Sequence, residues 1–223
     1  MKKGSASLKL VMERPPKRIV AAFQELPTTA VAEFLTVDSV MHHVIRPLWA
    51  PMPRIAGSAC TVRTVKHDNL MLHTAIYHAE PGDVIVVQAG DDRTAVADAN
   101  VCAVAQRRGV AGFIVDGVIR DLAASRGRSF PIFARGVSPI PGGQDGPGEI
   151  GVPITCGGVR VDPGDVVVAD EEGVVVVPRA RAETVLKNAR ARAARDAAES
   201  LSDWERKHRA RVESTLRAHG YLD

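Results

Sequence analysis

The sequence predicts an α/β protein, and three observations support this prediction. Short apolar runs rich in Val and Ile alternate along the chain with segments of helical spacing. The composition is that of a globular protein, with 45% hydrophobic and 25% charged residues. Aromatic residues make up only 4% of the chain, so Val, Ile, Leu and Ala must fill the core. The length of 223 residues favours one large domain, or one domain with a helical extension.

Helical and extended patterns alternate through the first part of the chain. Residues 18–48 contain helical spacing, with a break and a helix start at Pro27-Thr28-Thr29. Residues 54–65 alternate in hydrophobicity and are rich in β-branched side chains, which predicts a strand. The segment NLMLHTAIYHA, 69–79, predicts a helix, and PGDVIVVQAG, 81–90, predicts a turn followed by a buried strand.

The same alternation continues into the middle of the chain. Residues 94–109, TAVADANVCAVAQRRG, predict a helix that ends at Gly109. Residues 110–117, VAGFIVDG, predict a strand that stops at the turn signal Asp116-Gly117, and a further helix begins near Arg120. A short strand is expected within FPIFARGV, followed by a Gly- and Pro-rich loop over 138–151.

The end of the chain changes in character at Pro178. Before it, VPITCGGVRV and PGDVVVADEEGVVVVP predict strands joined by turns. After it, an Ala- and Arg-rich stretch without Pro or Gly until Gly220 predicts helix. We therefore divide the chain into an α/β domain, 1–178, and a helical extension, 179–223, that packs on its own body or on a neighbouring subunit. Its apolar stripe consists of Leu186, Ala189, Ala193, Ala197, Leu201 and Trp204.

Charge, cysteine usage and hydropathy exclude several classes of protein. A net charge of +3 is too small to indicate a nucleic-acid partner. There is no run of about 18 apolar residues, so no membrane span is expected. The basic N-terminal stretch MKKGSASLKLVMERPPK lacks the sustained apolar region of a signal peptide. Three widely separated cysteines favour free thiols in a reducing compartment, and we expect a cytoplasmic location. These cysteines are Cys60, Cys102 and Cys156.

Common catalytic motifs are missing from the sequence. The seven histidines show no metal-binding spacing, and each is more typical of a structural or surface position. No GxSxG or phosphate-binding GxxxxGK[ST] motif occurs. The strongest candidate for a functional site is the adjacent pair Arg120-Asp121, which lies between a predicted strand and the helix that follows it. Ligands of α/β proteins bind beyond the carboxyl ends of strands, which is where this pair is expected.

The chemistry of this pair indicates a carboxylate and a metal. Arg120 can bind a substrate carboxylate through two hydrogen bonds, whereas Asp121 would repel the same anion unless a cation lies between them. Mg²⁺ or Mn²⁺, held by one carboxylate and several waters, resolves that conflict. The alternative is a simple Arg–Asp surface pair. The start of the preceding helix offers backbone N–H groups that could bind the same anion, or it is an ordinary solvated turn. These N–H groups belong to Asp98, Ala99, Asn100 and Val101.

Several motifs together resemble one family over about residues 20–200. They are RGVAGFIVDGVIRD, FPIFARGVSP, VPITCGGVRVDPGDVVVADEEGVVVVP, AGSACTV and PGDVIVV. The sequence resembles the 4-hydroxy-4-methyl-2-oxoglutarate aldolase family, which also contains the regulator of ribonuclease activity A. The resemblance implies a compact α/β/β sandwich of the swivelling-domain type. It also implies a homotrimer or homohexamer with active sites at the subunit interfaces.

The resemblance further implies an activity and a site. Enzymes of the family are divalent-metal pyruvate aldolases that also decarboxylate oxaloacetate. In their D-G-x-x-R-D pattern the Arg binds the pyruvyl carboxylate and the final Asp anchors the metal, which are Arg120 and Asp121 here. The family's backbone amides match residues 98–101. A carboxylate from the C-terminal helix of a neighbouring subunit matches Asp196 by spacing.

One position departs from the aldolase pattern. Aldolase members carry an acid, within Gly-Asp-Leu or Gly-Glu-Leu, where this chain has Ala99. The Asp98-Ala99 pair is closer to the non-enzymatic regulators, although those usually lose the metal aspartate, which is present here as Asp121. Asp98 is our candidate to replace the missing acid. The sequence thus favours a metal-dependent carbon–carbon lyase; the alternatives are a regulator that binds ribonuclease E and a lyase for a different 2-oxo acid.

Overall fold

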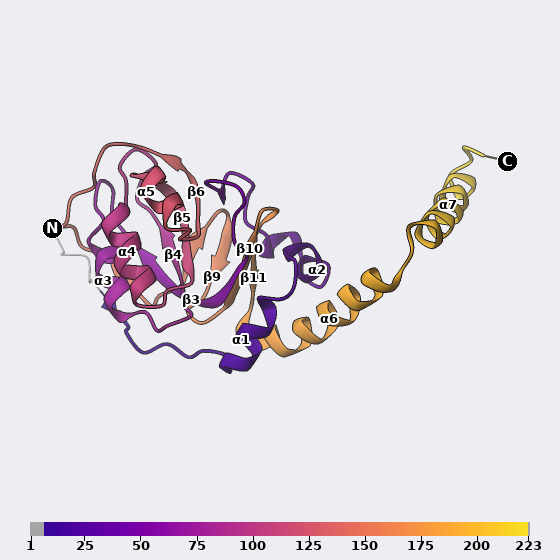
Figure 1. The fold of residues 1–223 in the computed structure, drawn as a ribbon, viewed down its shortest axis with the longest axis horizontal. Coiled ribbons are helices and arrows are strands. Elements are labelled where there is room, and N and C mark those ends of the chain that lie inside the picture. The colour runs from indigo at the N-terminus through magenta and orange to yellow at the C-terminus, as the bar shows by residue number, and fades with distance from the viewer. Residues whose placement is uncertain (1–6, 223) are drawn as a thin grey trace.

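The computed structural model describes residues 7–222, and these fold as layers of helices and strands with a helical arm at one end (Figure 1). Nine of the described strands form one sheet, in which the order β1-β7-β3-β4-β5-β6-β2 is extended by β10 and β11 beside β3. These strands are β1 (Ser7–Leu8), β2 (Arg46–Pro47), β3 (Ile55–Arg63), β4 (Val84–Gln88), β5 (Gly112–Ile119), β6 (Ile132–Val137), β7 (Glu149–Ile150), β10 (Val166–Asp170) and β11 (Gly173–Val177).

A separate hairpin and a set of helices complete the fold. The hairpin pairs β8 (Ile154–Cys156) with β9 (Val159–Val161) in antiparallel register. The helices are α1 (Lys17–Phe23), α2 (Thr28–Ala32), α3 (Leu70–His78), α4 (Ala99–Arg107), α5 (Leu122–Gly127), α6 (Ala182–Ala198) and α7 (Leu201–Ala218), with short 3-10 turns at Val37–Ser39 and Arg179–Arg181.

The central part of the fold is a run of four parallel strands connected by helices. β3, β4, β5 and β6 pair in parallel with their neighbours, and α3, α4 and α5 provide the crossovers between them. Parallel strands place their carboxyl ends at the same edge of a sheet. The segments that follow β4 and β5 therefore meet at one edge, which is where the sequence analysis expects the site.

The long strand β3 connects the two β layers. Its first half pairs antiparallel with β10, and its second half, from Ala59 onward, pairs parallel with β4. Gly57 lies near the point where β3 changes its partner from β10 to β4. A Cβ atom at this position would collide with the carbonyl oxygen of Gly82. The close approach of these two backbones therefore requires glycine at this position.

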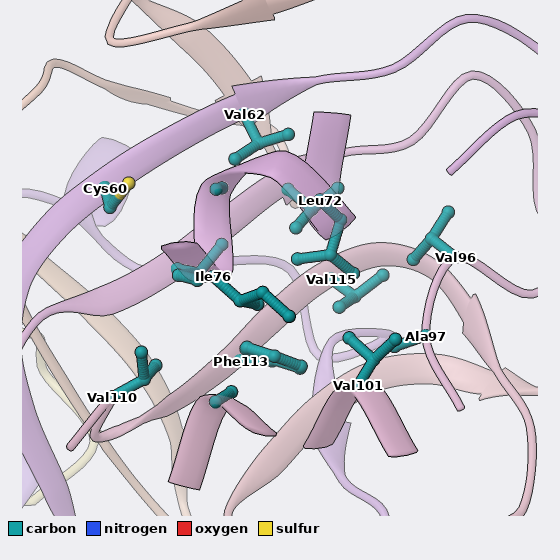
Figure 2. Packing of buried hydrophobic residues seen from close by; sticks show 14 of the residues in the cluster. Cys60, Val62, Leu72, Ile76, Val96, Ala97, Val101, Val110, Phe113 and Val115 are labelled. Carbon is teal, nitrogen blue, oxygen red and sulfur yellow. The ribbon is translucent and has the colours of Figure 1, made fainter. Parts of the chain in front are cut away.

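Alternation along the strands divides the core between the layers. In β4, Ile85 and Val87 pack beneath the helices α3 and α4, whereas Val84 and Val86 face β8, β9, β10 and β11. Figure 2 shows the first of these clusters, with Leu72 of α3 and Phe113 of β5 among its members. Strands buried on both faces read as continuous apolar runs, which is the pattern that the sequence carries.

A third cluster covers the outer face of the β10–β11 hairpin. There Val166 and Val175 pack against α1, α2 and the first half of α6. Thr28, at the start of α2, donates hydrogen bonds from its backbone N (3.0 Å) and its Oγ1 (2.6 Å) to the carboxylate of Asp170. The three clusters together give the α/β/β sandwich with added outer helices, so the expected fold class is confirmed.

Two element boundaries differ from the sequence analysis. The strand predicted to stop at Asp116-Gly117 continues to Ile119, with a β-bulge against β6 between Val115 and Val118. The Asp116 carboxylate accepts the backbone N–H of Gly157 at 2.8 Å, so this residue anchors the bulge and does not form a turn. The helix predicted over 94–109 begins only at Ala99, because Ala95 extends the sheet by bridging to Val118.

The C-terminal extension, predicted to be helical, consists of two helices, α6 and α7. The break falls at Glu199–Ser200, and Ser200 caps α7 by accepting the N–H of Asp203 at 3.1 Å. Leu186 and Ala189 of the predicted stripe are buried, but Leu201 is 79% exposed. None of the described residues of α7 is buried, and Figure 1 shows this helix projecting from the body. The stripe therefore packs on its own body only at its beginning.

The cysteines and the hydropathy of the helices agree with the sequence analysis. Cys60, Cys102 and Cys156 are buried free thiols, and burial raises the pKa of Cys60 to about 12. Within residues 7–222 we find no helix that is long and apolar enough to span a membrane. Residues 1–6 of the basic N-terminal stretch lie outside the described part of the chain.

Candidate functional site

Arg120 and Asp121 connect the end of β5 to the start of α5. Asp121 is the residue before the helix and has φ of 57°, in the left-handed region that few residues other than glycine, asparagine and aspartate adopt readily. Its side chain makes no capping bond to α5. Instead its Oδ2 atom accepts a long hydrogen bond of 3.4 Å from the backbone N–H of Ala99 at the start of α4. This conformation turns the carboxylate away from its own helix and toward the neighbouring one.

Asp98 is the N-cap of α4 and joins the pair from the other side. Its Oδ1 accepts hydrogen bonds from the backbone N–H groups of Asn100 and Val101, both at 3.0 Å. Its Oδ2 accepts a hydrogen bond from Nη2 of Arg120 at 3.0 Å. Burial by itself raises the pKa of Asp98, but the Val101 N–H, the Arg120 guanidinium and the Asn100 N–H outweigh it and lower the pKa below its usual range. Asp98 is therefore ionised.

The guanidinium of Arg120 lies between two carboxylates. Its Nη2 atom is 3.0 Å from Oδ2 of Asp98, and its Nε atom is 3.9 Å from Oδ2 of Asp121. The backbone N–H of Arg120 donates to the carbonyl of Ala97 at 3.0 Å. About a third of the Arg120 side chain is exposed (34%), compared with 49% for Asp121 and 20% for Asp98. Among the residues the structure describes, the Arg120 side chain makes one hydrogen bond, to Asp98. Most of its donors remain available to an incoming anion.

The predicted amide pocket at residues 98–101 is only partly open. The N–H groups of Asn100 and Val101 already donate to the Asp98 cap, which the sequence analysis did not anticipate. The Ala99 N–H, with its long bond to Asp121, is weakly engaged. An aspartate at this position is a strong helix cap, so it competes with any ligand for these two amides.

Asp196 is not part of the cluster within one chain. It lies in the distal half of α6, where its carboxylate pairs with Arg192 at 2.8 Å. Helix α6 packs against α1 and α2, whereas α4 packs against α3 and α5. A role for Asp196 at the site consequently requires a neighbouring subunit and stays a prediction.

The loop before α4 is held by residues that the sequence analysis did not select. Asp91 accepts the backbone N–H groups of Arg93 (2.7 Å), Thr94 (2.8 Å) and His67 (2.6 Å). Although burial raises its pKa, these donors and the Thr94 hydroxyl lower the pKa of Asp91 to about 2. The sequence signal was an Asx pattern, Asp followed at two and three residues by its donors. This network holds residues 91–94 in the connection between β4 and α4.

The carboxylates suit a hard cation that keeps much of its water. The described part of the chain contains no group of three or more His, Cys, Asp or Glu residues that could enclose a metal. A closed tetrahedral zinc site is therefore not formed by these residues. Asp121, half exposed and with only one long hydrogen bond to its Oδ2, fits Mg²⁺ or Mn²⁺, which are commonly held by one or two carboxylates together with substrate and water.

Removing the Asp98 side chain should destabilise the protein in a pH-dependent way. We expect Asp98→Ala to lower the free energy of unfolding by about 1 kcal/mol, because the α4 cap is lost, and Asp98→Asn to lower it less, because asparagine still caps. The pKa of Asp98 is depressed by folding, so the stabilisation from its charge is complete above the unfolded-state pKa of about 3.9 and is lost as pH falls through the folded-state pKa. Urea denaturation of the wild type and both variants, at neutral and at strongly acidic pH, measures this. An Asp98→Asn deficit that is the same at both pH values would contradict the charge contribution.

The comparisons with known proteins agree with this fold. Residues 28–176 match the RraA-like family model described as Aldolase/RraA, which covers more than half of the chain. The chain therefore belongs to the RraA-like family, and the expected family assignment is confirmed. A protein of Halalkalibacterium halodurans, named "Putative 4-hydroxy-4-methyl-2-oxoglutarate aldolase", is 38% identical over 205 residues, which are 92% of this chain and 93% of that protein.

Solved structures extend the similarity to the regulators of the family. RraAS2 of Streptomyces coelicolor, described as an unusual member of the RNase ES inhibitor RraA family, has a TM-score of 0.69 and 30% identity, covering 89% of this chain and 99% of that chain. The RNA-processing inhibitor RraA of Thermus thermophilis has a TM-score of 0.64 and 29% identity, covering 70% of this chain and 94% of that chain. Some of the similar proteins are thus named as enzymes, and others are named as regulators.

Proposed function

We propose that this protein is a divalent-metal-dependent lyase that cleaves a carbon–carbon bond of a 2-oxo acid and releases pyruvate. The observation that supports the proposal is the cluster of Arg120 between Asp98 and Asp121 at the carboxyl edge of the parallel strands. A structural ion pair needs one carboxylate, whereas this arrangement offers an arginine fork and a second, half-exposed carboxylate. The relatives named as aldolases support the same class of reaction.

Arg120 would bind the substrate carboxylate. Its guanidinium retains donors beyond the one given to Asp98, and a bidentate contact would orient the 2-oxo acid at the edge of the sheet. The Ala99 N–H, which is only weakly engaged, is the amide best placed to add a third bond. Asp98 would hold the guanidinium in place; because its pKa is depressed, it is a weak base in this state.

Asp121 would hold the cation. When bound, Mg²⁺ or Mn²⁺ would supply Lewis-acid stabilisation of the negative charge that develops on the 2-oxo oxygen. Aldol cleavage breaks the bond between C3 and C4, the proton of the 4-hydroxyl passes to a base or water, and the electron pair forms the enolate that takes up a proton to become pyruvate. Decarboxylation of oxaloacetate gives the same enolate, so one site would serve both reactions.

Assembly and location form part of the proposal. We place the protein in the cytoplasm, in keeping with its three buried free thiols. A homotrimer or homohexamer would allow α6 of a neighbouring subunit to bring Asp196, which is exposed in the single chain, to the site.

A second candidate function is a regulator that acts by binding ribonuclease E. Ala99 in place of the expected acid and the regulator names among the structural relatives favour it. The intact Arg120-Asp121 pair favours the lyase. A third possibility, a lyase for another 2-oxo acid, uses the same residues with a pocket shaped by the loop over 138–151.

The experiment that tests the proposal is an assay of the purified protein for pyruvate. Oxaloacetate and 4-hydroxy-4-methyl-2-oxoglutarate are supplied separately, with Mg²⁺, with Mn²⁺ and with EDTA. We expect turnover with either metal and its loss in EDTA. Binding of Mn²⁺ without turnover of either compound would indicate another 2-oxo acid. If neither Mn²⁺ nor pyruvate binds, the lyase proposal is wrong and the regulator becomes the better hypothesis.

A further inference from the structure

A cleft of about 560 Å³ lies at the elbow between α6 and α7, away from the cluster around Arg120. Figure 1 shows this elbow projecting from the α/β body. The volume of the cleft is in the range of small-molecule sites. We call it the elbow cleft, and its two walls are lined by Arg192, Arg195 and Asp196 of α6 and by Trp204, Lys207 and Arg211 of α7.

Three carboxylates line the elbow cleft, and each is paired with a cation of the same two helices. The pairs are Arg192–Asp196 (2.8 Å), Lys207–Glu199 (2.7 Å) and Arg206–Asp203 (2.6 Å). The bond between Lys207 and Glu199 connects α7 to the end of α6 and so helps to fix the angle of the elbow. Because each of these acids already has a cationic partner, its negative charge is offset and repels an incoming anion less.

Two arginines of the elbow cleft have no carboxylate partner. Arg195 comes from α6 and Arg211 from α7, and both are exposed. Neither side chain makes a hydrogen bond or an ion pair with the residues that the structure describes. Two guanidinium groups without an opposite charge therefore line one cleft from its two walls. Arginine binds phosphate through paired N–H donors, so a ligand with phosphate groups complements these charges.

Trp204 adds a planar apolar surface to the same cleft. The residue is 47% exposed, although tryptophan is among the side chains that gain most from burial. Its ring stacks on that of His208, with the centroids 4.5 Å apart and the planes at 9°, which holds the indole in one orientation. Nucleobases stack on exposed aromatic rings, and cationic side chains beside such rings bind the phosphates.

We infer that the elbow cleft binds a free nucleoside phosphate, with Arg195 and Arg211 on its phosphates and Trp204 against its base. A ligand that carries negative charges and one planar ring uses all three of these side chains. The net charge of the chain, +3, does not favour a long nucleic acid, whereas a single nucleotide requires only these local charges. The inference is independent of the proposed lyase function, because none of the three residues belongs to the candidate site.

Isothermal titration calorimetry of the whole protein with ADP tests this inference. EDTA is present throughout, so that a metal at Asp121 makes no contribution. We expect ADP to bind, and pyrophosphate, which has the charges without the base, to bind more weakly. Arg195→Ala and Arg211→Ala should each weaken ADP binding about 10-fold, because a charge-assisted hydrogen bond to phosphate is lost. Trp204→Ala should weaken ADP binding by about 10-fold and leave pyrophosphate binding unchanged, whereas Trp204→Phe, which keeps a ring, should retain most of the affinity.

The matched control is Arg209→Ala on α7. It removes the same charge from an exposed position that does not line the cleft, where the side chain pairs with Glu213 at 2.8 Å, and it should leave ADP binding unchanged. Circular dichroism shows whether each variant keeps its helices. A wild type that does not bind ADP at millimolar concentration would overturn the inference, as would equal losses in Arg209→Ala and in the two cleft arginine variants. Tighter binding of a short single-stranded RNA than of ADP would overturn the assignment to a free nucleotide.

Discussion

Asp121→Asn is expected to reduce metal-dependent pyruvate release by about 10³-fold, roughly 4 kcal/mol of transition-state stabilisation. The substitution removes the negative charge that would hold the cation but keeps the size of the side chain. Asparagine also tolerates the left-handed conformation of residue 121, at φ 57°, so the fold should be retained. Steady-state kinetics with Mn²⁺, together with a Mn²⁺ titration followed by electron paramagnetic resonance, measure turnover and metal binding separately.

A matched control for Asp121 lies on β9 and its following turn. Asp162 has a side chain of similar exposure, 46% against 49%, and it also pairs with an arginine, Arg160, at 2.8 Å. Asp162→Asn should leave both turnover and Mn²⁺ affinity unchanged. Full Mn²⁺ binding and turnover in Asp121→Asn would mean that another group holds the metal.

Arg120→Ala is expected to lower kcat/KM by about 10²- to 10³-fold, because two charge-assisted hydrogen bonds to the substrate carboxylate are lost. Arg120→Lys should recover only part of this loss, since an ammonium group cannot form the bidentate contact. Because no replacement for the guanidinium is present in the alanine variant, the pKa of Asp98 should also rise toward its ordinary value.

Kinetics and carboxyl-carbon NMR together test the role of Arg120. A large rise in KM for the 2-oxo acid with an upward shift in the Asp98 titration fits a residue that contacts both groups. Arg160→Ala, which breaks the comparable pair with Asp162, is the control and should affect neither measurement. If the Asp98 titration shifts but KM and kcat do not change, Arg120 is a structural partner of Asp98 only.

The layered core shows which features of a fold a periodic sequence pattern can predict and which it cannot. The apolar run VIVV of β4 predicted a buried strand, and the structure places Ile85 and Val84 in different clusters, one on each face. The run could not show which neighbours cover each face, because β3 bends from one layer to the other at Gly57. Pairing over such distances along the chain is decided by packing and leaves no local signal.

A local sequence signal misplaced one boundary near the site for the same reason. Asp116-Gly117 has the composition of a turn, yet in the fold the Asp116 carboxylate bonds Gly157 and the strand continues through a bulge. The long-range partner outweighed the local preference. The C-terminal stripe also looked continuous, but a Ser200 cap divides it and leaves Trp204 half exposed.

The sequence by itself determined the α/β class, the family resemblance and the pairing of Arg120 with Asp121, because these depend on residue types at short spacing. Only the tertiary structure decided that Asp98 binds Arg120, since the two residues are 22 positions apart and no local pattern joins them.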